Sequence, residues 1–251
     1  SGNVKHYVNG QLIANTFGTT VNLSSNANTL TLGKWSSGYV DGKLDNVRIF
    51  NYARTAAQIA WDYNQGKPVG WWKFDECQGA TANDSSGNQN TGTITIGGTG
   101  TQTSAGTCTT INTATAWYNG RTGKFNSSLN FDGTDDFIDA GSGSSLDIID
   151  STSNAGSLTA WIKTTASVTN KWIIDTKTAG TNNAGYDFSI NSSNQLQIRY
   201  ANGTSQTNLV ATFTLNDGAW HHVVGIIDRI NSKFYIYIDG KLTSSSSAAT
   251  L

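Results

Sequence analysis

Apolar and polar residues alternate with a period of two over much of this 251-residue chain. Such alternation is typical of β-strands that bury one face. It is clearest in four stretches, residues 158–162, 188–190, 196–200 and 234–238. Turn-forming pairs such as Asn202-Gly203 and Asp239-Gly240 separate these stretches and reach positive φ easily. Short strands with turns about every ten residues predict an antiparallel sandwich of two sheets.

One segment departs from this alternation. Thr55 and Gln58 have the spacing of a capping box, and apolar residues follow them at helical spacing. Gly66 and Pro68 then end the pattern. The sequence therefore predicts one short helix, which caps the edge or end of a sheet.

Composition supports an all-β fold and excludes several classes of function. Gly occurs 27 times but Pro and Glu only once each, so few strong helix formers remain. The formal net charge is −1, which argues against partners bound through a basic surface, such as nucleic acid or anionic lipid. No apolar run reaches the length of about 18 residues needed to cross a bilayer, so no membrane insertion is expected. The start at Ser1 shows no initiator Met and no signal-peptide pattern, which predicts a piece of a longer protein.

A repeat links the two ends of the chain. Residues 6–12 (HYVNGQL) resemble residues 236–242 (IYIDGKL), and Gly240 minus Gly10 gives an offset of 230 positions. The chain thus contains one period plus an overlap of about twenty residues, which is typical of a tandem array.

The two cysteines, Cys77 and Cys108, flank a loop without histidine, which argues against zinc. Two readings stay open, a disulfide and a pair of free thiols. The disulfide is favoured, and it would indicate an oxidising compartment outside the cytoplasm.

Several motifs resemble those of laminin-G-like, concanavalin A-like domains. Residues 70–76 (GWWKFDE), 84–92 (DSSGNQNTG) and 128–138 (SLNFDGTDDFI) are similar to the opening of such a domain. Residues 220–224 (WHHVV) resemble its middle, and residues 44–54 (LDNVRIFNYAR) resemble its end. The resemblance implies an antiparallel two-sheet jelly roll, in which the first and last strands are neighbours.

The order of these motifs differs from that of one ordinary domain. Residues 1–65 match the C-terminal strands and short helix, whereas residues 66–251 match the N-terminal and middle strands. Three arrangements remain open: closure within one chain as a circular permutant, completion of a neighbouring chain's sandwich, and flanks of a longer covalent array. Because residues 6–12 and 236–242 compete for the same place, an array or a head-to-tail assembly is favoured.

Catalysis is not expected. Glycosidases of this shape commonly use two carboxylates on a Glu-x-Asp-x-x-Glu strand, and a chain whose one glutamate is Glu76 cannot contain that motif. Asp135 and Asp136 are adjacent, and neighbours on a strand point to opposite faces, so a turn or calcium role is expected for them. The adjacent His221 and His222 lack a nucleophile motif, so we expect one packed and one surface histidine.

Calcium is the expected ion, with a structural role, because it prefers oxygen ligands. Asp84 and Asn88 stand in a Gly-containing turn, and the resemblance places Asp45 near the end strands, where similar domains hold calcium. The alternative is that Asp84 and Asn88 only cap the turn by hydrogen bonds to the backbone.

Sugar binding would need an aromatic platform with polar neighbours. If residues 234, 236 and 238 point inward, Tyr235 and Tyr237 lie on the outer face, where Trp161 and Arg199 could join them from adjacent strands. The alternative is cross-strand aromatic packing, or burial against a neighbouring module.

The sequence thus predicts a non-catalytic, extracellular β-sandwich with a structural or adhesive role at the cell surface. Its partners would be copies of itself or neighbouring repeats, in a tandem array or a strand-exchanged filament. The alternative is a carbohydrate-binding module of a larger secreted protein, with cell-surface or environmental glycans as partners.

Overall fold

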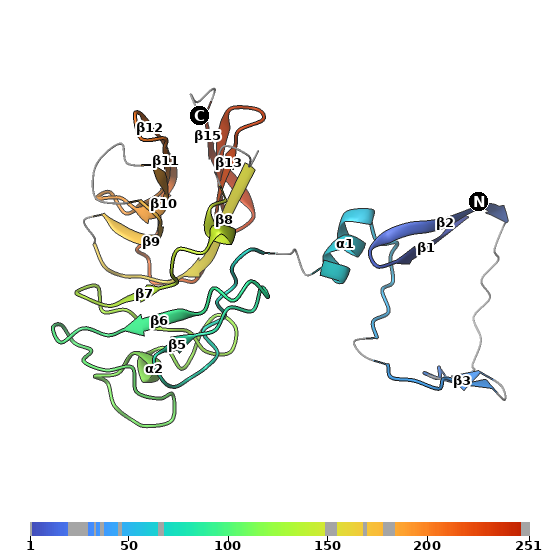
Figure 1. Cartoon of the computed structure of the whole chain (residues 1–251), viewed down its shortest axis with the longest axis horizontal. Helices are drawn as coiled ribbons and strands as arrows, with labels where there is room; N and C mark the ends of the chain where they lie inside the picture. The colour runs from blue at the N-terminus through green and yellow to red at the C-terminus, as the bar shows by residue number, and fades with distance from the viewer. Residues whose placement is uncertain are drawn as a thin grey trace. The chain divides into compact units, whose positions relative to one another are not determined.

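The structure is a computed structural model, and it describes residues 2–19, 30–32, 34–35, 38–44, 47–64, 68–148, 155–167, 170–177 and 184–246. The chain divides into two compact units, Ser1–Pro68 and Val69–Leu251 (Figure 1). Asp45 of the predicted calcium site lies outside the described residues.

The first unit contains an antiparallel hairpin, a short strand pair and a helix. Strands β1 (Gly2–Val8) and β2 (Gln11–Thr19) form the hairpin, and β3 (Lys34–Trp35) pairs with β4 (Gly38–Tyr39). Helix α1 spans Ala56–Asn64. The predicted capping box is confirmed, because the Gln58 N–H donates to Thr55 Oγ1 at 3.2 Å and the Thr55 N–H donates to Gln58 Oε1 at 2.9 Å.

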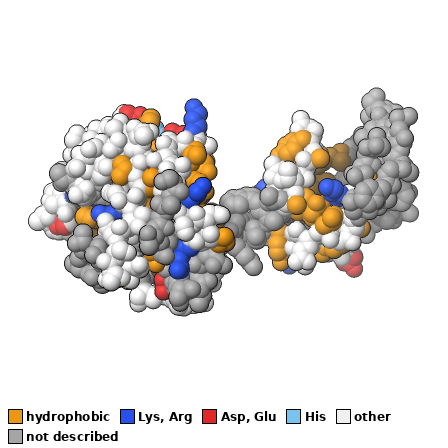
Figure 2. Space-filling view, turned by 90° about the horizontal axis from the view of Figure 1, so that it is seen from above, with side chains coloured by type: hydrophobic (Ala, Val, Ile, Leu, Met, Phe, Trp, Pro, Cys, Tyr) orange, Lys and Arg blue, Asp and Glu red, His pale blue; other side chains and the backbone are white. Residues whose placement is uncertain are grey.

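This first unit has no core among its described side chains, none of which is buried. Figure 2 shows hydrophobic side chains in orange on its surface. Its exposed large apolar residues are Val4, Val8, Leu12, Ile13, Leu30, Leu32, Tyr39, Val40, Leu44, Val47, Ile49, Phe50, Tyr52 and Tyr63. The segment expected to supply the last strand, residues 44–50, has no strand pairing in its described part, residues 44 and 47–50.

The second unit contains a sandwich of two four-stranded antiparallel sheets (Figure 1). One sheet has the order β12-β11-β10-β9, and the other has the order β15-β14-β13-β8. The first consists of β9 (Lys171–Asp175), β10 (Gly185–Ile190), β11 (Gln195–Ala201) and β12 (Gln206–Thr214). The second consists of β8 (Ala155–Ile162), β13 (His221–Asp228), β14 (Lys233–Ile238) and β15 (Lys241–Ser245). The four predicted strands all lie within these sheets.

The main core lies between the two sheets and takes every second residue of most of their strands. Phe234, Ile236 and Ile238 point into it, as predicted. Packing is closest at Gly225 of β13, where a Cβ atom would lie 2.6 Å from Ile198 Cδ1 and 2.9 Å from Phe188 Cε2. Only glycine fits there, because both neighbours belong to the facing sheet.

A smaller lobe precedes the sandwich in sequence. It contains the three-stranded sheet of β5 (Thr81–Ala82), β6 (Gly92–Thr95) and β7 (Phe137–Asp139), helix α2 (Ala116–Asn119) and, further on, the 3-10 turn η1 (Ser144–Leu146). Trp117 is fully buried at its centre, and its indole N–H donates to the Gly79 carbonyl at 2.8 Å. The predicted disulfide between Cys77 and Cys108 is confirmed, and it joins residues 31 positions apart.

Candidate functional site

The residues predicted as a glycan platform lie on two different sheets. Trp161 on β8 and Tyr235 and Tyr237 on β14 share the outer face of one sheet. Arg199 lies on β11, on the outer face of the other sheet. Outer faces of a sandwich point in opposite directions, so the prediction that these four residues form one platform is wrong.

Trp161 is packed by other side chains. The Lys124 Nζ atom lies 4.5 Å from the centroid of its ring, Phe125 meets it edge-on at 5.7 Å, and His222 lies against it at 5.1 Å. A cation on one face and rings around it leave less aromatic surface for a sugar. This geometry fits cross-strand aromatic packing better than a sugar platform.

On the other sheet, Arg199 belongs to an ion pair that the sequence did not reveal. Its Nε donates to Asp187 Oδ1 at 2.9 Å and to Oδ2 at 2.8 Å. Asp187 points away from the core, yet only 1% of its side chain is exposed. Lys177 Nζ lies 3.8 Å from the same carboxylate and donates to Gln206 Oε1 at 2.6 Å. A buried carboxylate requires such partners, and these two cations supply them to Asp187.

An exposed aromatic residue lies on this same outer face. Trp172 of β9 is 53% exposed and pairs with Ser189 of β10, which in turn pairs with Gln197 of β11. Ser189 Oγ donates to Asp187 Oδ1 at 3.2 Å. Trp172 therefore stands on one side of the small Ser189, and Gln197 and Arg199 stand on the other. An aromatic ring beside polar donors is the combination that sugars require.

Sequence reasoning missed Trp172 because its polar neighbours on the sheet lie on β10 and β11, beyond the reach of a local pattern. A register shift between Phe188 and Ser189 also turns Trp172 to the outer face, which simple alternation does not anticipate. A local signal existed for Asp187, since an ionisable residue stands within a strand of otherwise apolar or uncharged residues (GYDFSI).

The turn predicted to hold calcium is held together by hydrogen bonds. Asp84 Oδ1 accepts from the N–H groups of Trp71 and Ser86 at 2.9 and 2.8 Å. Its Oδ2 accepts from the Ser86 hydroxyl at 2.7 Å and the Asn90 N–H at 2.9 Å. Burial alone would raise the pKa of Asp84, but these bonds from Ser86, Trp71 and Asn90 outweigh it and lower that pKa. With Asn88 Nδ2 donating to the Val69 carbonyl at 3.1 Å, the geometry favours the capping alternative.

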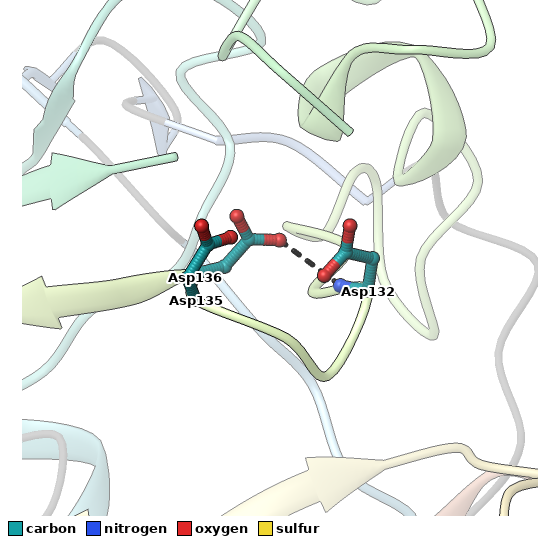
Figure 3. Close-up of side chains that lie close together, drawn as sticks. All are labelled: Asp132, Asp135 and Asp136. Carbon is teal, nitrogen blue, oxygen red and sulfur yellow. Dashed lines mark hydrogen bonds between the residues drawn. The ribbon is translucent and has the colours of Figure 1, made fainter. Parts of the chain in front are cut away.

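Three other carboxylates converge in the loop before β7 (Figure 3). One oxygen of each of Asp132, Asp135 and Asp136 lies within 4.8 Å of the others, so the three could bind a metal ion together. The expectation that Asp135 and Asp136 point to opposite faces is wrong, because β7 begins only at Phe137 and both residues precede it.

Backbone N–H groups donate to each of these three carboxylates, whereas the buried Asp135 Oδ1 has no hydrogen-bond partner among the described residues. Asp132 Oδ2 accepts from the N–H groups of Thr101 and Gln102 at 2.7 and 2.9 Å. The Thr99 N–H donates to Asp135 Oδ2 at 3.0 Å, and the Asp132 N–H donates to Asp136 Oδ2 at 3.0 Å. The bond from Gln102 is the main reason that the pKa of Asp132 lies below its ordinary value. The cluster thus fastens the loop to the start of β7.

The two adjacent histidines differ as predicted. His221 is buried on β13, and its ring lies between two carboxylates, with Nδ1 2.8 Å from Asp239 Oδ2 and Nε2 3.1 Å from Asp217 Oδ1. His222 is half-buried, and its Nε2 lies 2.9 Å from Thr159 Oγ1. In the described part of the chain, the ring of His221 thus links two turns, and the ring of His222 links β13 to β8.

The one glutamate borders an open depression of about 650 Å³, together with Gln78, Gly79, Thr81, Asn83 and Thr107. Glu76 Oε1 accepts from the Asn83 N–H at 2.7 Å, whereas the buried Oε2 has no hydrogen-bond partner among the described residues. This one carboxyl group is the only acidic side chain in the lining, whereas the two-carboxylate mechanism of glycoside hydrolysis needs two.

The chain matches the model of one protein family, described as the concanavalin A-like lectin/glucanases superfamily, over residues 1–60 and 132–251. Among curated proteins the comparison found no match. In the described part of the chain, no helix has both the length and the apolar character to cross a membrane.

Among solved structures, the chain is similar to an S-layer domain-containing protein from Clostridium thermocellum, at 17% identity and a TM-score of 0.40, with 72% of this chain and 73% of that chain covered. It is also similar to domains LG4-5 of the mouse laminin alpha1 chain, at 17% identity and a TM-score of 0.33, covering 41% of this chain. The Ruminococcus gnavus IT-sialidase CBM40 matches at 15% identity and a TM-score of 0.32, covering 37% of this chain. The chain spans 26% of the laminin structure and 53% of the sialidase module.

Proposed function

This chain belongs to the concanavalin A-like lectin/glucanases superfamily, and from that premise we propose that it is a non-catalytic structural or adhesive module that is completed by neighbouring copies of itself. In this proposal residues 1–65 supply the C-terminal strands and short helix of a jelly roll. Residues 66–251 supply the N-terminal and middle strands. The copies are consecutive repeats of an array, or separate chains in a filament.

The observation that carries this proposal is the absence of a core in the first unit. None of its described side chains is buried, and apolar residues such as Val8, Ile49 and Phe50 face solvent. An isolated two-stranded hairpin is marginally stable in water, and an exposed apolar surface of this extent is typical of an interaction site. The first unit therefore needs a partner that covers it.

Two further observations support the non-catalytic and extracellular parts of the proposal. The three converging carboxylates accept backbone hydrogen bonds, and Glu76 stands without a second carboxylate in its depression. The disulfide between Cys77 and Cys108 is typical of proteins in oxidising environments, outside the cell or at its surface.

Light scattering on the full chain over a range of about 1 to 200 μM tests the proposal, since association between chains must depend on concentration. We expect the mean mass to rise with concentration. The variant Ile49→Asp, which charges the exposed apolar surface of the first unit, should associate less. Trp172→Asp places the same charge on another exposed apolar position, in the sandwich, and serves as the control. A monomer at every concentration would refute self-completion.

A second function, carbohydrate binding, is favoured by the outer face of β9–β12. Trp172 has an exposed ring there. Arg199 binds Asp187 through its Nε atom, so in the described part of the chain its terminal Nη groups remain as donors. Glycan-array binding should be lost in Trp172→Ala and Arg199→Ala. Trp161→Ala, on the other sheet, is the matched control and should bind like the parent. Equal loss in all three variants, or no binding by the parent, would reject this function.

A further inference from the structure

We propose that the hairpin β1–β2 is a donor element, and that it fits a second copy of this chain in the position that β14–β15 holds within its own sandwich. The inference rests on the proposed function and names the two surfaces that meet. It is carried by the backbone geometry and the burial of the two hairpins.

The two hairpins have the same register at the offset of 230 residues. Val8 pairs with Gln11 as Ile238 pairs with Lys241, and Tyr7 pairs with Leu12 as Tyr237 pairs with Leu242. Both contain the same irregularity one step further, since His6 pairs with Ala14 as Ile236 pairs with Ser244. A bulge at a matching position sets the same local twist in both ribbons.

The turns also agree in conformation. Asn9 and Gly10 have φ values of 51° and 75°, and Asp239 and Gly240 have values of 51° and 76°. Two consecutive residues with positive φ form the tight turn that matches the twist of paired strands. The first hairpin thus has the backbone needed to occupy the place of the second.

The corresponding side chains differ strongly in burial. Phe234 is 0% exposed and Ile238 is 4% exposed, whereas their counterparts Val4 and Val8 are 50% and 53% exposed. In the second unit this face of the ribbon is part of the core formed with the facing sheet. The same face of β1 has no such cover.

The receiving surface consists of the β13 edge and the inner face of β9–β12. Strand β14 pairs with β13 along its whole length, from Val223 opposite Ile238 to Asp228 opposite Lys233. At the centre of that pairing, Gly225 is opposite Ile236, and Phe188 and Ile198 approach from the facing sheet. Val4 and Val8 are smaller than Phe234 and Ile238, so the donor enters this space without overpacking, and His6 takes the place of Ile236 opposite Gly225.

The partner is a second copy because only a sandwich of this kind offers a β13 edge in this register. Within one chain, the tethered β14–β15 hairpin occupies that edge with an effective concentration of the order of millimolar. Exchange therefore becomes measurable when the resident hairpin is weakened. Phe234→Asp does this, since it places a charge at a fully buried position of β14.

Two full-length variants test the exchange by cross-linking. The donor carries Tyr7→Cys, and the acceptor carries Val224→Cys together with Phe234→Asp. Val224 pairs with Tyr237, so Tyr7 of a docked donor would lie directly opposite it, with Cβ atoms about 4.5–5.5 Å apart. The natural cysteines are already bonded to each other, so the introduced thiols are the free ones. Each chain carries one, so any donor–acceptor disulfide is intermolecular.

We expect a cross-linked pair under mild oxidation, at least ten times more abundant than with an acceptor that keeps Phe234. Adding Val4→Asp and Val8→Asp to the donor should abolish it. The acceptor should also melt at a higher temperature when mixed with donor. An acceptor that stays unfolded in the presence of donor, or a yield equal to that of the controls, overturns the inference.

A second acceptor, with a milder substitution than Phe234→Asp, distinguishes a failure to exchange from a failure of the acceptor to fold. Gly240→Ala strains the turn of the resident hairpin at φ 76° and leaves the buried face unchanged. With it, we expect a weaker but specific cross-link, and its absence would count against the exchange. If the chain self-associates in light scattering but neither acceptor is cross-linked, the assembly uses another surface. The proposed function would then stand while this inference fails.

Discussion

Replacing His221 by glutamine tests whether one buried imidazole fastens two turns of the sandwich. His221 stands on β13, and its two ring nitrogens contact Asp239 in the β14–β15 turn and Asp217 in the loop before β13. Both nitrogens donate only when the ring is protonated. Burial alone would lower the pKa of His221, but the bonds to Asp239 and Asp217 outweigh it and raise that pKa above its ordinary 6.5.

The direction of the pH effect follows from this shift. Because the folded protein holds the His221 proton more tightly than the unfolded chain, the stabilisation is complete below about pH 6.5 and is lost as the pH rises through the folded pKa. In that window the free energy of unfolding falls by at most about 1.4 kcal/mol per pH unit. The two carboxylates affect stability at the acidic end of the pH range. The pKa values of Asp217 and Asp239 lie below their ordinary 3.8, so their contribution is lost as the pH falls below about that value.

Hydrogen bonds to charged groups contribute about 1.5–3 kcal/mol each when a partner is removed. Both carboxylates are about half exposed and keep backbone donors, from Ala219 to Asp217 and from His222 to Asp239. The cost of His221→Gln is therefore expected near the lower end, about 2 kcal/mol at pH 6.

Urea unfolding followed by tryptophan fluorescence at pH 5.5, 6.5 and 8 measures this effect. The difference between parent and His221→Gln should shrink as the pH rises, whereas His222→Gln should keep the pH dependence of the parent. Parallel pH profiles for the parent and His221→Gln would refute the reasoning.

Four further predictions concern stability. Asp187→Ala leaves the buried ammonium of Lys177 and the partly buried guanidinium of Arg199 without their carboxylate, and should cost about 3 kcal/mol in urea unfolding; a loss below about 1 kcal/mol would contradict the stabilising ion pair. Reducing the disulfide of Cys77 and Cys108 should cost about 2–4 kcal/mol, measured by melting with and without reductant, and an unchanged melting temperature would argue against a stabilising role. Gly225→Val should destabilise by about 1–3 kcal/mol because the facing sheet fills its space, and an unchanged unfolding midpoint would show that the sheets can separate there. Asp84→Ala should lower the melting temperature equally with and without chelator, because N–H and O–H donors occupy its oxygens; a melting temperature that EDTA lowers only when Asp84 is present would instead indicate calcium.

Local patterns predicted the strands and the helix correctly. In 234–238 the alternation identified the buried face, and the spacing of Thr55 and Gln58 identified the cap of α1. These features depend on neighbours within about four residues, so the sequence contains them directly.

The candidate site depends on contacts between strands, which a local sequence pattern does not predict. Arg199 and Trp161 both stand in alternating strands, but pairing with β10 or with β13 decides which sheet each strand joins. Asp135 and Asp136 converge because β7 begins only at Phe137, after both of them, so the alternation rule does not apply to them.

The sequence by itself determined the fold class, the short helix, the buried face of the strand at 234–238 and the repeat that duplicates the hairpin. Only the tertiary structure decided which side chains share a surface, because strand pairing joins residues far apart in the chain. It also showed that Val8 faces solvent while Ile238, in the same register, lies in a core. Two hairpins with similar local sequences differ in burial because the burial of a strand depends on the elements packed against it. Those elements come from elsewhere in the fold.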